Sequence, residues 1–323
     1  MNKLAAFSLL VQDDIREVET LMRSQAQGYH PDLNAALDLI LKSGGKRIRP
    51  SITMLIGRIL GASHERLVII SSAIELLHTA TLVHDDLIDG ALLRRGMPTL
   101  NSQWSPGATV LTGDFLFARA AKLAADSNSI PVMNLFAKTL TIIVNGEITQ
   151  LFTSRCIASR EDYERRIFAK TASLFETSAA SAALLSEASQ HIVQAMNDFG
   201  RNIGMAFQMI DDILDFSGEQ ATLGKPVGSD LRQGLITLPA LLYFEQHPED
   251  DAAQEILSGK CVEESQRVNV LIESIRSGDS IRQARVEARK YIDQALESLA
   301  VLPASIERSA LEELANYIVD RDF

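Results

Sequence analysis

Two clusters of aspartates interrupt otherwise apolar stretches of this chain. Their members are Asp85, Asp86 and Asp89 in the first cluster and Asp211, Asp212 and Asp215 in the second. In each cluster two aspartates are four residues apart, so on a helix they project from one face. At an effective dielectric constant of about 20, two unit charges 4 Å apart repel by roughly 4 kcal/mol. Each cluster therefore needs either a cation or a wet surface.

A solvated helix face is the more common explanation for a single acidic triplet. Here the residues around the first cluster are mostly apolar, as in Leu82-Val83 and Leu87-Ile88, and the pattern occurs a second time. Carboxylate oxygens suit Mg²⁺, which binds one or two carboxylates together with substrate phosphates. If the two clusters face each other, divalent ions between them could bind a diphosphate.

Basic segments accompany both clusters. In the segment Gly44-Gly45-Lys46-Arg47-Ile48-Arg49-Pro50, two glycines precede three cations where a helix is predicted to begin. Free backbone N–H groups at a helix N-terminus, together with Lys and Arg, favour an anion site. A basic loop before an ordinary helix is the alternative. Further cations follow the first cluster, precede the second and follow the second; they are Arg94, Arg95, Lys170 and Lys225.

Helices must position these residues, because the apolar period of 3.6 residues recurs along the chain while strand-like alternation is rare. The predicted fold class is all-α, and Gly, Pro, Ser and Asn mark the breaks between helices. The predicted helices are 8–26, 31–43, 46–60, 65–94, 106–126, 129–153, 160–187, 190–217, 230–246, 250–258, 263–276, 279–300 and 304–320. A helix of 30 residues would span about 45 Å, enough to line a long cavity.

Composition excludes several classes of protein. The 323 residues carry a net charge of −11, which argues against a nucleic-acid surface, and 46% are hydrophobic, as in ordinary globular proteins. No long linker separates two domains, so a single domain over 1–323 is predicted. No uninterrupted apolar run approaches the 18 or so residues of a membrane span. Two cysteines, Cys156 and Cys261, fit a reducing compartment without a disulfide framework.

The motifs together resemble those of the trans-isoprenyl diphosphate synthase family. The resemblance runs from Gly44 to Leu238 and depends on DDLID and DDILD, with GGKRIRP before them and RR between them. It implies a single-domain bundle of long helices around a central cavity, the isoprenoid synthase fold. It also implies Mg²⁺-assisted departure of an allylic diphosphate, attack by C4 of isopentenyl diphosphate on the resulting carbocation, and loss of a proton.

The resemblance also assigns roles by position. The metal-binding set would be Asp85, Asp86, Asp89, Asp211 and Asp212, with Asp215 in a supporting position. The allylic diphosphate would be bound by Arg94, Lys170 and Lys225. Isopentenyl diphosphate would be bound by Lys46, Arg49, His78 and Arg95. Thr171 and Gln208 lie where neutral oxygens could stabilise the carbocation, while His78 taken alone would more often be a core residue.

One position departs from the family pattern. Family members usually carry Gly-Lys-x-Thr after the second cluster, whereas this chain has Gly234-Leu235-Ile236-Thr237. Losing one charge-assisted contact would cost roughly 1.5–3 kcal/mol. The change points to weaker allylic binding, another substrate preference or a compromised enzyme, and the intact motifs favour the first two.

Product length is predicted from the helix that carries the first cluster. In the family, a bulky aromatic residue four or five positions before the first aspartate stops growth early, and here those positions hold Thr81 and Ala80. Phe136 on a neighbouring helix is a candidate floor of the product tunnel, with plain core packing as the alternative. The sequence therefore predicts a long product of about eight isoprene units.

The predicted function is a Mg²⁺-dependent long-chain polyprenyl diphosphate synthase that extends an allylic primer such as farnesyl diphosphate, for a quinone side chain. A geranylgeranyl or farnesyl diphosphate synthase, or a non-catalytic subunit of a heteromeric synthase, are the alternatives. A terpene cyclase would not need the isopentenyl site. A cytoplasmic homodimer is expected, with peripheral membrane contact during product release and no nucleic-acid partner.

Overall fold

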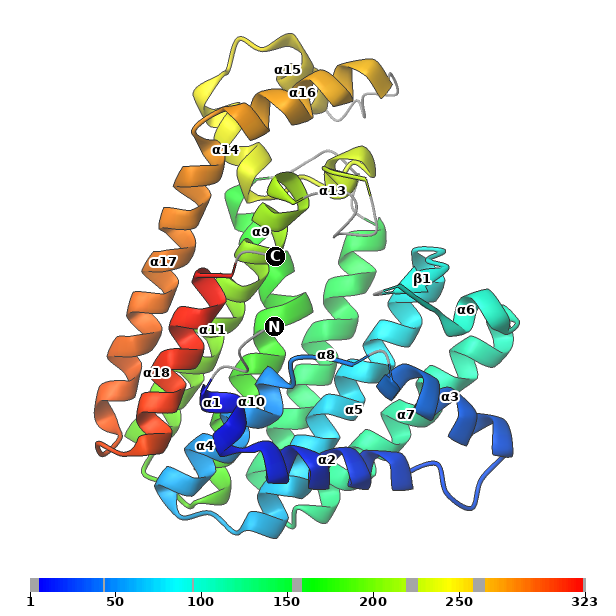
Figure 1. Cartoon of the computed structure of the whole chain (residues 1–323), viewed down its shortest axis with the longest axis vertical. Coiled ribbons are helices and arrows are strands. Elements are labelled where there is room, and N and C mark those ends of the chain that lie inside the picture. The colour runs from blue at the N-terminus through cyan, green and yellow to red at the C-terminus, as the bar shows by residue number, and fades with distance from the viewer. Residues whose placement is uncertain are drawn as a thin grey trace. The chain divides into compact units, whose positions relative to one another are not determined.

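The computed structural model describes residues 6–42, 44–94, 96–152, 159–218, 226–257 and 265–321 (Figure 1). Within these ranges the chain is almost entirely helical. The only strands there are a two-residue antiparallel pair, β1 (Leu93–Arg94) and β2 (Met97–Pro98). The predicted all-α class is therefore confirmed. Arg95, Lys225, Cys156 and Cys261 lie outside the described residues.

The chain divides into two compact units, which are described separately. The first consists of Met1–Thr141, Leu174–Gly200 and Ser298–Leu314, and the second of Ile142–Ser173, Arg201–Glu297 and Ala315–Phe323. The first unit holds α1 (Ala6–Leu10), α2 (Gln12–Ser24), α3 (Pro31–Lys42), α4 (Ile48–Leu60), α5 (His64–Ile88), α6 (Leu100–Gln103), α7 (Pro106–Asp126) and the 3₁₀ turn η2 (Leu299–Val301).

The second unit holds shorter helices around the second aspartate cluster. They are α9 (Arg160–Ile167), the π-helix η1 (Phe168–Ala172), α13 (Ser229–Arg232), α14 (Leu238–Gln246), α15 (Asp251–Leu257) and α16 (Ser265–Ser277). Five helices contain residues of both units: α8 (Ile130–Phe152), α10 (Ser173–Leu185), α11 (Gln190–Ser217), α17 (Ser280–Ser298) and α18 (Ile306–Val319).

Helix α5 is the central element of the first unit, and it packs against α2, α4 and α7 (Figure 1). In the part of the chain that the structure describes, α5 alone is long and apolar enough to cross a membrane, yet 72% of its apolar window is buried inside the protein. Ile70, Ile74, Leu77 and Ala80 are each at most 1% exposed. Burial by its neighbours therefore accounts for the apolar character of α5.

His84 helps to join α5 to α7. Its Nε2 lies 3.1 Å from the carbonyl oxygen of Val110, and its ring packs edge-on against Phe117. A Cβ atom at Gly113 would lie 2.2 Å from Nε2 of His84, so only glycine leaves room for the imidazole there. His84 thus has a packing role next to Asp85.

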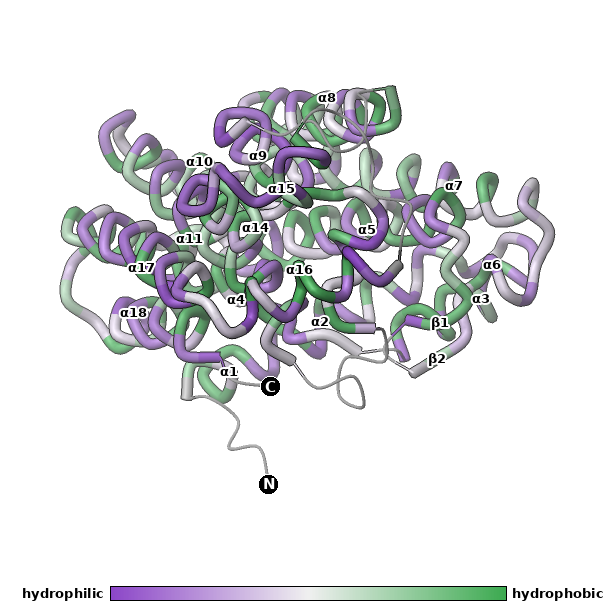
Figure 2. The backbone as a smooth tube through the Cα atoms, turned by 90° about the horizontal axis from the view of Figure 1, so that it is seen from above, coloured by the Kyte–Doolittle hydropathy of each residue, from purple (hydrophilic) through white to green (hydrophobic). Residues whose placement is uncertain are grey.

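The core of the second unit is apolar and continuous. Large side chains from α9, α11, α14 and α16 fill it, including those of Met209, Phe216, Leu242 and Ile275. Helix α17 packs one face against this core. The buried residues of that face recur every three or four positions: Ala284, Ala288, Ile292 and Ala295. Figure 2 shows the alternation of hydrophilic and hydrophobic residues along α17 that this one-sided burial requires.

Several predicted helices end earlier or break. The predicted helix 65–94 ends at Ile88, because the chain turns through Gly90 at φ 63° into the β1–β2 hairpin. The predicted helix 160–187 contains the π-helix η1, and 230–246 is two helices, α13 and α14, with Gly234 at φ 78° between them. Left-handed glycines end helices, which the apolar period alone does not reveal.

Candidate active site

The first aspartate cluster lies at the C-terminal end of α5. Asp86 is 7% exposed, and Nε of Arg94 donates to its Oδ1 and Oδ2 at 2.9 and 3.1 Å. Asp85 is half-buried, while Asp89 caps the helix and is exposed. The sequence assigned Arg94 to a diphosphate. In the structure its guanidinium balances the charge of Asp86, which leaves Asp85 and Asp89 as the more accessible carboxylates.

The second cluster lies on α11, and a chain of hydrogen bonds holds its middle aspartate. Oη of Tyr163 donates to Oδ2 of Asp212 at 2.8 Å, and Nε2 of Gln208 donates to Oδ1 at 2.9 Å. The hydroxyl of Thr171 donates to Oε1 of Gln208 at 2.6 Å, which fixes the orientation of that amide. The structure therefore brings together three predicted residues, Thr171, Gln208 and Asp212. Sequence reasoning did not identify the fourth, Tyr163.

Asp212 is the most strongly perturbed carboxyl of this site. Burial raises its pKa to about 7, and the charge of Asp230 adds to the shift, while the donors Gln208 and Tyr163 and the nearby Arg166 oppose it. A group titrating near neutrality at a cluster of acidic side chains is typical of a functional site. Binding a cation here would favour the ionised carboxylate.

The other two members of the second cluster have separate partners. Nη2 of Arg321 lies 2.8 Å from Oδ1 of Asp211, and its guanidinium also lies 4.3 Å from the centre of the Phe207 ring. The buried Asp215 accepts a hydrogen bond from the backbone N–H of Asp230 at 3.2 Å. Arg321 was not predicted, because no local pattern links a residue near the C-terminus to α11.

The π-helix η1 presents the predicted cation of this unit. Lys170 is exposed, and its Nζ lies 3.1 Å from Oε1 of Glu147 on α8. The next residue, Thr171, faces inward to Gln208. Such a π-helical turn is rare and occurs often at functional sites. Here the two neighbours reach different partners, one outside and one inside.

The basic segment of the first unit precedes α4. Lys46 is exposed, and the guanidinium of Arg49 lies 4.5 Å from the centre of the Phe175 ring. Arg47, which the sequence did not single out, is turned inward. His78 is half-buried on α5. The remaining cations assigned to diphosphates, Arg95 and Lys225, are outside the described residues.

The fit to a divalent metal depends on the chemistry of the donors. Each cluster offers carboxylate oxygens, the ligands that Mg²⁺ prefers; Asp89 is exposed, and Asp211 is half-buried and paired with Arg321. Among the described residues, no group of three or more His, Cys, Asp or Glu side chains is gathered closely enough to hold an ion. By donor chemistry alone, the carboxylates of each cluster suit a hard cation that takes further ligands from water and phosphate.

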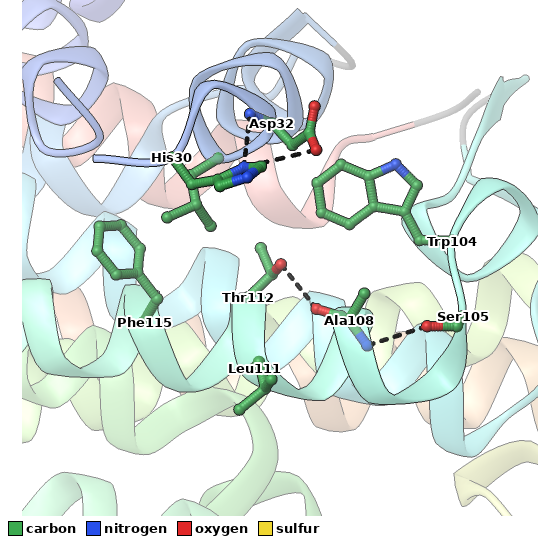
Figure 3. Close-up of a pocket in the computed structure, with 9 residues that line it drawn as sticks. His30, Asp32, Trp104, Ser105, Ala108, Leu111, Thr112 and Phe115 are labelled. Carbon is green, nitrogen blue, oxygen red and sulfur yellow. Dashed lines mark hydrogen bonds and ion pairs between the residues drawn. The ribbon is translucent and has the colours of Figure 1, made fainter. Parts of the chain in front are cut away.

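A cavity of about 580 Å³ lies elsewhere, between α3 and α7. Figure 3 shows His30 and Asp32 on one side, with Trp104 and Phe115 flanking the space above α7. None of the residues assigned to metal, diphosphate or product length lines it. This cavity is therefore not the predicted site.

The residues predicted to set product length are all in the first unit. Ala80 and Phe136 are 0% and 1% exposed, and Thr81 is half-buried, with its hydroxyl donating to the carbonyl of His78 at 2.7 Å. Burial is compatible with either a tunnel wall or plain packing. Their role in product length thus stays a prediction.

Comparison with known proteins gives the same picture along the whole chain. A sequence model described as polyprenyl synthetase matches residues 30–275. Component 2 of heptaprenyl diphosphate synthase from Geobacillus stearothermophilus is 38% identical over 99% of this chain and 100% of the relative. Octaprenyl diphosphate synthase from Escherichia coli K12 is 37% identical, covering 97% of each chain. The crystal structure of polyprenyl synthase from Caulobacter crescentus, with calcium and isoprenyl diphosphate, gives a TM-score of 0.91 at 34% identity, covering 99% and 98%.

Proposed function

We propose that this chain, which belongs to the polyprenyl synthetase family, makes a long all-trans polyprenyl diphosphate of about C40 with the help of Mg²⁺. The comparisons confirm the family and the isoprenoid synthase fold that the motifs predicted. The chain is therefore a prenyltransferase that makes polyprenyl diphosphates. The proposed chain length depends on the two aspartate clusters together with the small residues before the first of them. Ala80 and Thr81 stand five and four positions before Asp85, where a bulky aromatic residue would stop growth.

The proposed mechanism assigns each group of residues one task. The metal would be held by Asp85, Asp86, Asp89, Asp211 and Asp212, with Asp215 in support. When bound, Mg²⁺ would neutralise the allylic diphosphate and make it a better leaving group. Arg94, Lys170 and Lys225 would stabilise the same group as its charge grows. The calcium and isoprenyl diphosphate named for the Caulobacter relative support a divalent cation in this role.

The second substrate would bind to the cations of the first unit. Lys46, Arg49, His78 and Arg95 would hold the diphosphate of isopentenyl diphosphate, so that its C4 carbon attacks the allylic cation. One C–O bond breaks, one C–C bond forms, and a proton leaves. Thr171 and Gln208 would stabilise the cation through their oxygens, an arrangement supported by the hydrogen bond between them.

Product length gives a direct test at α5. Ala80→Phe places an aromatic ring five positions before Asp85, and we expect the main product to shorten to C15–C20 with little loss of isopentenyl incorporation. Reversed-phase chromatography of dephosphorylated products measures the change. Leu82→Phe, on the opposite side of α5, is the matched control and should leave the length unaltered. An unaltered length in Ala80→Phe would remove Ala80 from the tunnel wall.

Leu235 gives a second test, on allylic binding. Leu235 is half-buried in the turn between α13 and α14, where its N–H donates to the carbonyl of Asp230 at 2.8 Å. Leu235→Lys restores the usual cation, and we expect the KM for farnesyl diphosphate to fall about tenfold, because a charge-assisted contact contributes 1.5–3 kcal/mol. The KM for isopentenyl diphosphate serves as the internal control. Equal KM values in both proteins would show that Leu235 does not face the diphosphate.

A heteromeric synthase is the second candidate, because the Geobacillus relative is named as one component of its enzyme. The retained aspartates of both clusters favour a catalytic chain over a non-catalytic one. A homodimer in the cytoplasm, serving a quinone side chain with peripheral membrane contact at product release, is the assembly that we propose. Light scattering of the purified chain, with turnover measured on the same sample, separates a self-sufficient dimer from a component that needs a second protein.

The function is tested by the purified chain with labelled isopentenyl diphosphate and farnesyl diphosphate. We expect label to enter organic-extractable product with Mg²⁺ and to stop on addition of EDTA. Incorporation that persists in EDTA would contradict the metal-dependent mechanism. Incorporation only after a second protein is added would favour the heteromeric alternative.

A further inference from the structure

Arg47 differs from the two cations on either side of it. Its side chain is 12% exposed, whereas Lys46 is exposed and Arg49 packs over the Phe175 ring. Nε of Arg47 donates to Oε1 of Glu19 at 2.8 Å, and Nη1 donates to Oε1 of Glu75 at 2.9 Å. The side chain of Glu75 is only 6% exposed. The middle cation of the basic segment is thus bound inside the protein and is not available to a substrate.

The backbone of Arg47 is also unusual. It has φ 47° and ψ 36°, the left-handed region, which is unfavourable for a residue with a Cβ atom. Such conformations persist where the surroundings hold them, and they are frequent at ligand sites. Here the two ion pairs hold the residue, and Oε2 of Glu75 is buried without a hydrogen-bond partner. The protein therefore accepts two local costs to keep this arginine in place.

The position of Arg47 connects the basic segment to two other helices. Arg47 is the N-cap residue of α4, and its carbonyl accepts hydrogen bonds from the backbone N–H and the hydroxyl of Ser51 at 3.1 and 2.8 Å. Glu75 lies on α5, three residues before His78, so both occupy the same side of that helix. Glu19 lies on α2. One guanidinium thus fixes the start of α4 against the helix that carries His78.

We propose that Arg47 is the positioning residue of the isopentenyl diphosphate site, and that Glu75 and Glu19 hold it so that Lys46, Arg49 and His78 converge on one diphosphate. The inference depends on the proposed function for the identity of that ligand. A free Lys at this place could not bridge two carboxylates in fixed directions as the planar guanidinium does. In this segment the positioning cation, Arg47, lies between the two cations that would bind the diphosphate, Lys46 and Arg49.

Three variants test the role. Arg47→Gly relieves the left-handed backbone and removes both ion pairs. We expect its KM for isopentenyl diphosphate to rise at least about tenfold, because small displacements of a binding group are costly. The KM for farnesyl diphosphate should stay within about twofold. Glu75→Gln should raise the KM for isopentenyl diphosphate less than Arg47→Gly does. Arg47→Lys keeps a cation at this position and should show a KM between those of the wild-type protein and Arg47→Gly. Calorimetry with inorganic pyrophosphate and the metal-free chain gives a readout without turnover, where Arg47→Gly should bind more weakly.

Arg58→Gln is the matched control. Arg58 also joins α4 to α2, through Nη2 at 2.6 and 2.8 Å from the carboxylate of Asp14, but at the far end of α4. It should lower thermal stability and leave both KM values unaltered. Equal rises in both KM values, or a loss of stability alone, would overturn the positioning role. If Arg47→Gly does not fold, the KM for isopentenyl diphosphate in Glu75→Gln and Arg47→Lys decides whether Arg47 has the positioning role. A wild-type chain that consumes no isopentenyl diphosphate would instead refute the proposed function.

Discussion

Replacing Asp212 by Asn should remove the contribution that this carboxyl makes to the pH dependence of stability of the metal-free protein between pH 5 and pH 8. The folded pKa of Asp212, about 7, lies above its ordinary value of 3.8. The folded state therefore binds a proton that the unfolded state has already released, and stability falls as pH rises toward 7. From pH 5 to pH 8 this amounts to roughly 3 kcal/mol, at 1.36 kcal/mol per pH unit below the folded pKa. The asparagine has no proton to lose.

Denaturant unfolding in EDTA at pH 5, 6.5 and 8 measures the effect. The wild-type protein should lose roughly 3 kcal/mol relative to Asp212→Asn across this range. Tyr163→Phe is the companion variant, because it removes the phenol that donates to Oδ2 of Asp212 and so raises the pKa further. In Tyr163→Phe the fall in stability with rising pH should therefore continue to a higher pH than in the wild-type protein. Parallel pH curves for the wild-type protein and Asp212→Asn would contradict the assignment.

Replacing Asp85 by Asn should lower kcat by about 10²–10³, the loss typical of removing one preorganised group that stabilises a developing charge. The amide keeps the size of the side chain but cannot supply the negative charge that a metal needs. Since Asp85 is half-buried at the end of α5, we expect the folded structure to persist. Steady-state turnover at saturating substrates, followed by a Mg²⁺ titration, measures the loss.

Asp126→Asn is the control for that experiment. Asp126 pairs with Lys122 at 2.7 Å on the exposed side of α7, outside every site described above. It should retain full turnover. If Asp85→Asn also retains more than about a tenth of the wild-type rate, the first cluster is a solvated helix face and not a metal site.

Much of the fold could be predicted, because the apolar period of about 3.6 residues identifies long amphipathic helices. The range predicted for 106–126 is that of α7, and 190–217 is that of α11. Breaks that depend on a single residue were harder. The predicted helix 8–26 is two helices separated at Val11, and the π-helix within 160–187 has no sequence signature that a 3.6-residue period could reveal.

The sequence predicts the chemistry of the site, whereas the contacts between its residues depend on the folded structure. Aspartates grouped in an apolar stretch predict a metal and diphosphate site from the sequence alone. The partners that tune them are far away in sequence: Tyr163 is 49 residues from Asp212, and Arg321 is 110 residues from Asp211. Nor does the sequence tell that Arg47 turns inward while Lys46 stays exposed, because that depends on a left-handed backbone.

The mass of the product made by the purified chain tests the central claim most directly. With Mg²⁺, farnesyl diphosphate and excess isopentenyl diphosphate as the only additions, mass spectrometry should find all-trans polyprenyl diphosphates near C40. Products that end at C15 or C20 would contradict the long-chain assignment and the open path along α5 from which it was inferred.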